Sequence, residues 1–128
     1  MKVVALDFGR ARTGVAVSDP TGTLARPLGV VERAATDAGL ARVVELIRVE
    51  EAEQVVVGMP LTLRGEQGEQ ARETQAFVEA LRVAVDIPVE TFDERFTTTL
   101  AEQGGNGTPA DARAAAHLLS GYLEWRRR

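Results

Sequence analysis

The chain of 128 residues contains no cysteine and a single histidine, His117. Disulfide bonds and thiolate metal sites are therefore excluded, and one histidine does not provide the ligands that zinc usually takes. No segment approaches the length of a transmembrane helix, and an acid interrupts the opening "MKVVALDFG" too early for a signal peptide. We therefore expect a cytoplasmic protein with no membrane partner.

Lysine is also scarce. The chain has 15 basic and 19 acidic residues, a net charge of -4, and its only lysine is Lys2. This balance argues against coating nucleic acid by bulk charge, but it permits a local patch of arginines, which pair bidentately with phosphate. A content of 45% hydrophobic and 27% charged residues is typical of a globular protein, and we expect residues 1–128 to form one domain.

Strand and helix patterns follow one another in a definite order. Apolar runs predict strands, and apolar residues at helical spacing predict long helices. The expected strands are 2–8, 13–19, 26–32, 53–60 and 88–92, and the expected helices are 36–51, 69–85, 97–103 and 110–125. This order predicts an α/β fold, in which an antiparallel meander is extended by parallel strands into a mixed five-stranded sheet with helices on both faces.

Asp7 ends the first strand and begins the stretch "DFGRARTG". A carboxylate at a buried position is costly unless it is paired or binds a metal. One alternative is a structural role, in which Asp7 caps the turn "GRAR" or pairs with Arg10 or Arg12. We expect the turn itself to be tight, with Gly9 or Gly14 in an unusual backbone conformation.

Two further acids, Asp93 and Glu94, stand just past the fifth strand in "ETFDERFTTT". The carboxyl ends of parallel strands line the functional crevice of such a sheet, so either acid is a candidate ligand. The alternative is a solvated loop in which Glu94 pairs with Arg95 and a threonine caps the next helix.

Asp111 belongs to the start of the last helix. With Thr108 at the N-cap and Pro109 at N1, it fits the third position of a capping box and offsets the helix dipole. The other interpretation is that Asp111 points at the sheet. Small or apolar residues follow it on one helix face and allow a close approach; these are Ala114, Ala115 and Leu118.

Three carboxylates on separate elements form an oxygen-rich site for a hard divalent cation. Two such ions, roughly 3.5–4 Å apart, can activate a water molecule and stabilise the leaving oxygen in phosphodiester hydrolysis. For His117, in the middle of the last helix, we expect a structural role.

Five patches of the chain, in order and at compatible spacing, resemble the YqgF family, also called RuvX. They are "LDFGRARTGVAVSD", "VVVGMPLT", a glycine at 65 or 68, "FDERFTT" and "DARAAAHLLSGYL". The resemblance implies an RNase H-like fold, shared with RuvC resolvases. It also implies a nuclease that processes the pre-16S rRNA end or resolves Holliday junctions.

The resemblance further implies roles for individual residues. Asp7, Glu94 and Asp111 match the family's acids and would hold Mg²⁺ or Mn²⁺, whereas Arg12 and Arg95 match basic residues that touch phosphate or orient the acids. Two departures from the family pattern are visible. Ala11 stands where a basic residue is frequent, and the neutral to acidic "AEQGGNGTPAD" replaces a lysine-rich segment.

The leading hypothesis is a metal-dependent nuclease that acts on RNA, with ribosomal precursor particles as partners. The second is a resolvase of four-way DNA junctions, which requires a homodimer because two strands are cut. The third is a non-catalytic RNA-binding module of ribosome assembly. An actin-like ATPase ranks last, because it needs two domains around its nucleotide.

Overall fold

The structure is a computed structural model that describes residues 1–60, 68–93 and 110–127. It contains five strands and three helices in the predicted order. The strands are β1 (Val3–Asp7), β2 (Arg12–Ser18), β3 (Ala25–Glu32), β4 (Gln54–Met59) and β5 (Val89–Asp93); the helices are α1 (Asp37–Val49), α2 (Glu69–Ala84) and α3 (Ala110–Arg126). The expected helix over 97–103 lies outside the described residues.

The strands form one mixed sheet in the order β3-β2-β1-β4-β5, with β1 at its centre. β1, β2 and β3 pair antiparallel, whereas β4 and β5 extend the sheet in parallel with β1. The prediction of a meander extended by parallel strands is therefore confirmed.

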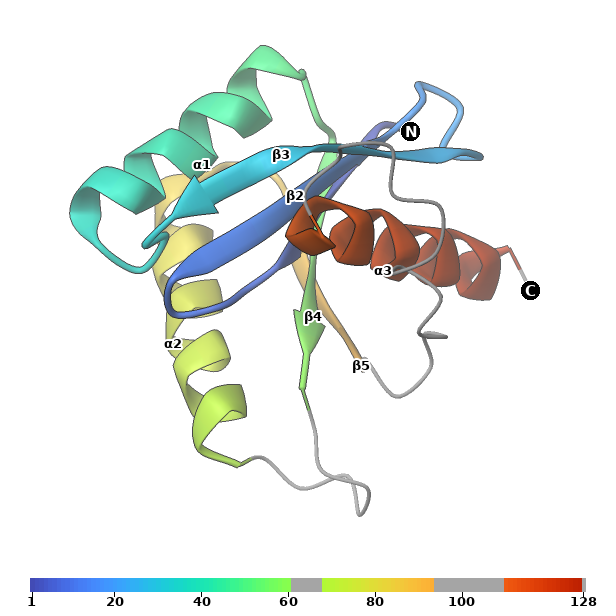
Figure 1. Ribbon diagram of the computed structural model, residues 1–128. Helices are drawn as coiled ribbons and strands as arrows, with labels where there is room; N and C mark the ends of the chain where they lie inside the picture. Colours follow the sequence, from blue (N-terminus) through green and yellow to red (C-terminus); the bar gives the residue numbers. More distant parts are fainter. Residues whose placement is uncertain (61–67, 94–109, 128) are drawn as a thin grey trace.

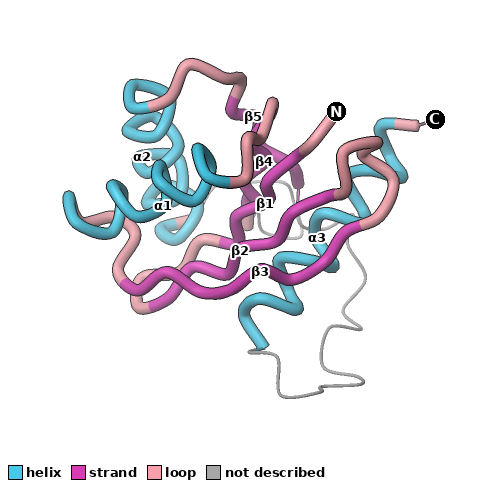
Figure 2. The backbone as a smooth tube through the Cα atoms, turned by 90° about the horizontal axis from the view of Figure 1, so that it is seen from above, coloured by secondary structure: helices cyan, strands magenta, loops and turns pink. Residues whose placement is uncertain are grey.

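Helices cover both faces of the sheet, with α1 and α2 on one side and α3 on the other (Figures 1 and 2). Side chains of β1 alternate between the two layers. Val4 and Leu6 belong to the apolar cluster under α1 and α2, and Val3 and Ala5 to the cluster under α3. Because strand residues alternate with a period of two, Asp7 belongs to the α3 face.

The helices bury the faces that their sequences predict. In α1, Val43 and Ile47 are buried, and the Thr36 hydroxyl caps the first turn by accepting a hydrogen bond of 3.1 Å from the Gly39 amide. In α2, the buried residues recur at helical spacing and form one face; they include Thr74, Phe77, Val78 and Leu81. Among the described residues, no helix has both the length and the apolar character needed to span a membrane.

A turn organised by Asp19 joins β2 to β3. Its carboxylate accepts hydrogen bonds from the amides of Thr23 (2.8 Å) and Leu24 (3.0 Å), and from the Thr21 hydroxyl. Gly22 in this turn has a φ of 71°, a conformation that favours glycine. The hydrogen bonds from Thr21, Leu24 and Thr23 lower the pKa of Asp19 well below its ordinary value.

This turn predicts a pH dependence of stability. Because the folded pKa of Asp19 lies below its unfolded value, Asp19 stabilises the fold above about pH 4, and this contribution is lost as the pH falls through the folded pKa. We expect Asp19→Asn to lower the midpoint of urea unfolding at pH 7, with a smaller difference between the two proteins at pH 3. An equal difference at both pH values would contradict this role of the Asp19 charge.

Candidate active site

The parallel strands β1, β4 and β5 end at one edge of the sheet, at Asp7, Met59 and Asp93. Helix α3 runs in the opposite direction to these strands. Its first turn lies against Gly14 near the start of β2, and its last turn lies near Gly22, just past the end of β2. The N-terminus of α3 is therefore at the carboxyl edge of the parallel strands, where the sequence predicts a catalytic crevice.

Gly14 allows α3 to touch the sheet. A Cβ atom on Gly14 would lie 1.9 Å from the carbonyl oxygen of Asp111, so no other residue fits there without moving the helix. Gly14 is also the cross-strand partner of Asp7, and opposed residues of an antiparallel pair point to the same face. The structure thus brings together Asp7 and Asp111, two of the three predicted acids, on the α3 face.

The turn between β1 and β2 is tight, but not for the expected reason. Neither Gly9 nor Gly14 has a positive φ, so the prediction of an unusual conformation is wrong. Both glycines are required for space. A Cβ atom on Gly9 would lie 2.5 Å from the Arg12 carbonyl oxygen.

The two arginines of this turn pair with different acids. Arg12 Nε donates to Asp111 Oδ2 at 2.9 Å. Arg10 Nε donates to both carboxylate oxygens of Glu73 at 2.7 and 2.8 Å, and Arg10 Nη2 donates to Glu69 at 3.3 Å. Each of these arginines thus connects the turn to a helix, Arg12 to α3 and Arg10 to α2.

The ion pair between Arg10 and Glu73 shifts the pKa values of both residues. The hydrogen bond from Arg10 to Glu73 holds the pKa of that carboxyl below its ordinary value, and the same contact raises the pKa of Arg10. The pair fastens the turn to the first turns of α2. It was not anticipated, because its partners lie 63 residues apart and no local pattern connects them.

Strand alternation determines which face of the sheet carries Asp93, the last residue of β5. Phe92 belongs to the cluster under α3, so the next residue, Asp93, belongs to the opposite face and pairs with Met59. The predicted ligand Glu94 and the predicted phosphate contact Arg95 lie outside the described residues. Thr108 and Pro109, the predicted N-cap and N1 residues of the last helix, lie outside them as well.

The donors present suit a hard cation, because Asp7 and Asp111 offer carboxylate oxygens. Within residues 1–60, 68–93 and 110–127, no three acids or histidines are grouped as a metal site. His117 is half-buried in α3.

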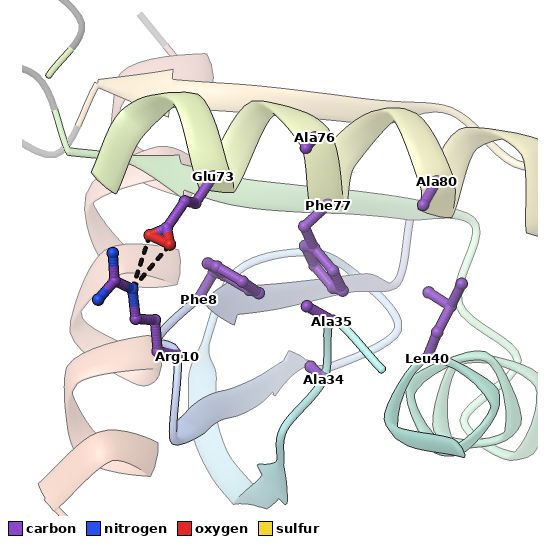
Figure 3. A pocket seen from close by; sticks show the side chains of 9 residues that line it. All are labelled: Phe8, Arg10, Ala34, Ala35, Leu40, Glu73, Ala76, Phe77 and Ala80. Atoms are coloured by element: carbon purple, nitrogen blue, oxygen red, sulfur yellow. Dashed lines mark hydrogen bonds and ion pairs between the residues drawn. The ribbon is translucent and has the colours of Figure 1, made fainter. Parts of the chain in front are cut away.

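A cavity of about 320 Å³ lies on the opposite side of the sheet, between α1 and α2 (Figure 3). The side chains of Phe8 and Phe77, whose ring centroids are 4.7 Å apart, line it together with several alanines, and the Arg10–Glu73 pair stands at its rim. Because Asp7 belongs to the α3 face, this cavity is separate from the acids.

Comparison with known proteins identifies the family. The model of the family described as "RuvX: Holliday junction resolvase" matches residues 1–125. The chain belongs to the RuvX family. Similar proteins include the "Putative pre-16S rRNA nuclease" of Anaeromyxobacter sp. (strain Fw109-5), 42% identical over 98% of both chains. The protein of the same name from Chloroflexus aurantiacus is 40% identical over 98% of this chain and 88% of its own. The RuvX chain is thus a member of a nuclease family.

Solved structures of resolvases share the fold. T. thermophilus RuvC in complex with a Holliday junction substrate aligns with a TM-score of 0.64 at 23% identity, over 99% of this chain and 96% of RuvC. The fowlpox virus resolvase, in complex with Holliday junction DNA, aligns with a TM-score of 0.64 at 12% identity over the whole of both chains. The predicted RNase H-like fold is therefore confirmed.

The contact at Gly14 can be tested by substitution. We expect Gly14→Ala to lower the free energy of unfolding by roughly 1–3 kcal/mol or more, because a methyl group would overlap the backbone of Asp111. Gly29 in β3 is the matched control, since a Cβ atom there has no neighbour within 4 Å. Gly29→Ala should change stability by no more than about 0.5 kcal/mol. Urea unfolding of both variants measures the difference, and equal stability would contradict the close contact.

Proposed function

We propose that this RuvX chain is a Mg²⁺- or Mn²⁺-dependent nuclease that hydrolyses phosphodiester bonds of RNA in the cytoplasm, with the pre-16S rRNA end in ribosomal precursor particles as its substrate. The names of the relatives support the substrate. One observation carries the proposal. At the carboxyl edge of the parallel strands, Asp7 is the cross-strand partner of Gly14, and the backbone of Asp111 packs against the same glycine.

In this proposal Asp7, Glu94 and Asp111 hold the metal. Two of these acids lie on regular elements of the fold. Asp7 ends the central strand, and Asp111 is in the first turn of a helix packed against β2. The alternation of β5 supports Glu94 over Asp93 as the acid from this strand, because Asp93 belongs to the face of α1 and α2.

When bound, the metal ions supply a nucleophile from water and stabilise charge on the leaving oxygen. The chain's own residues hold the acids in place and bind the substrate. The side chain of Arg12 is 63% exposed beside Asp111, so its guanidinium can reach a phosphate at the site. Arg95, directly after Glu94, is the second proposed phosphate contact.

A resolvase activity is the second candidate. The observation that favours it is the similarity in fold to two proteins solved with Holliday junction DNA. Paired cuts in a symmetric junction need two active sites, so this function requires a homodimer. A non-catalytic RNA-binding module is the third candidate.

Cleavage assays separate these candidates. Labelled single-stranded RNA and a synthetic four-way DNA junction are incubated with Mg²⁺ or Mn²⁺. We expect RNA cleavage, with a loss of roughly 100-fold or more in Asp7→Asn, Glu94→Gln and Asp111→Asn, because each removes a metal-binding carboxylate. Asp93→Asn is the matched control and should retain activity.

Each alternative has its own signature in this assay. Symmetric nicks in the junction without RNA cleavage would replace the proposal by the resolvase. Tight RNA binding without cleavage of either substrate would replace it by the binding module. Activity lost in Asp93→Asn and kept in Glu94→Gln would reverse the assignment of the second acid.

Metal binding has a separate readout in stability. A ligand that binds only the folded state at 100 times its Kd stabilises that state by about 2.7 kcal/mol. We expect Mn²⁺ to raise the melting temperature of the unmutated chain, EDTA to reverse the increase, and Asp7→Asn to abolish it. An equal increase in Asp7→Asn would place the ion elsewhere.

A further inference from the structure

The carboxylate of Asp111 already has a cation beside it. Arg12 Nε lies 2.9 Å from Asp111 Oδ2, although the two residues are 99 positions apart in the sequence. The arginine side chain is 63% exposed and that of the acid 41%, so the pair lies at the surface of the site and solvent can reach it. Asp111, the acid of this pair, is also one of the proposed metal ligands.

We propose that Arg12 competes with the divalent ion for Asp111, and that metal binding releases its guanidinium to the phosphate of the substrate. This inference rests on the proposed metal site. Arg12 is thus a positioning residue with two alternative partners. In the structure it neutralises Asp111; with metal bound, it binds the nucleic acid.

Electrostatics explains why the two cations exclude each other. The guanidinium donates to Oδ2, one of two carboxylate oxygens, and an ion on the same carboxylate would be held close to a like charge. A divalent ion has the larger charge and a preference for carboxylate oxygen. The arginine, on a long side chain anchored in β2, can move without any change in the backbone.

The neighbouring Arg10 shows the contrast. It makes three hydrogen bonds to two acids, Glu73 and Glu69, and these fasten the turn to α2. Among the described residues, the side chain of Arg12 makes one hydrogen bond, to Asp111. Of the two arginines in this turn, Arg12 is therefore the one that is released at the lower cost, and it is the one beside the proposed metal site.

The proposal couples the two ligands. Metal that displaces Arg12 favours the binding of phosphate, and phosphate that binds Arg12 favours the binding of metal. Loss of Arg12 therefore has opposite effects on the two affinities. A residue that only orients Asp111 would instead strengthen metal binding, and its loss would weaken it.

The test measures both affinities in Arg12→Gln. Mn²⁺ binding without RNA is followed by electron paramagnetic resonance at about 0.15 M salt, where distant charges are screened. We expect Arg12→Gln to bind Mn²⁺ roughly three- to fivefold more tightly, the upper part of the range of about 1.4- to 5-fold that corresponds to loss of an exposed ion pair. Arg12→Lys keeps the charge and should lie between Arg12→Gln and the unmutated chain. Arg10→Gln, the control in the same turn, should change the affinity less than about twofold.

Binding of single-stranded RNA is then measured by fluorescence anisotropy in Ca²⁺, a cation with the same preference for oxygen. We expect weaker binding by Arg12→Gln, and a slope of log affinity against log salt that is smaller by about 0.7, the value for one lost phosphate contact. An unchanged slope would overturn the assignment of phosphate to Arg12. Thermal unfolding of each variant checks that it is folded.

The outcomes separate this inference from the proposed function. If the unmutated chain and its Asp7→Asn and Asp111→Asn variants bind Mn²⁺ equally, the metal site itself is wrong. If those acids are required but Arg12→Gln binds Mn²⁺ no better than the unmutated chain, the competition is wrong and the metal site stands. Tighter Mn²⁺ binding together with the smaller salt slope establishes both roles of Arg12.

Discussion

The contact between Gly14 and the backbone of Asp111 determines the geometry of the candidate site. It fixes the first turn of α3 against β2, directly beside the strand that carries Asp7. The remainder of α3 then crosses the sheet with its buried residues, Ala115 and Leu118 among them, against the cluster that includes Ala5. A larger residue at position 14 would separate the two acids and disturb the packing of this helix together. The packing of α3 and the proposed chemistry therefore both depend on residue 14 being a glycine.

Local patterns in the sequence were sufficient for the elements of the fold. Apolar runs located β1 and β4, and helical spacing located α2, because these signals repeat within a few residues. Contacts between distant segments have no such signal. The Arg12–Asp111 pair and the Arg10–Glu73 pair could not be predicted, since each depends on how the layers stack. The role of Gly14 was misread for the same reason: its neighbour is 97 positions further along the chain, and the glycine serves packing rather than backbone conformation.

The turn between β1 and β2 is held from both layers of helices. Arg10 connects it to α2 on one side of the sheet, and Arg12 connects it to α3 on the other. The end of the central strand, where Asp7 lies, is thus supported by charged contacts on each face. The two arginines of the turn therefore lie where they neutralise acids of the adjacent helices. Each positive charge in the turn is already engaged in the absence of a ligand.

The net charge of -4 also constrains how a RuvX chain of this composition meets a polyanion. Carboxylates on one face repel phosphate, and steering by bulk charge is weak. Favourable approach then depends on local charge at the site, where a divalent ion would neutralise the negative charge of Asp7 and Asp111. On the proposed site, an ion that binds before the nucleic acid also makes the guanidinium of Arg12 available. The same event therefore removes a repulsion and supplies a phosphate contact, which favours metal binding first and nucleic-acid binding second.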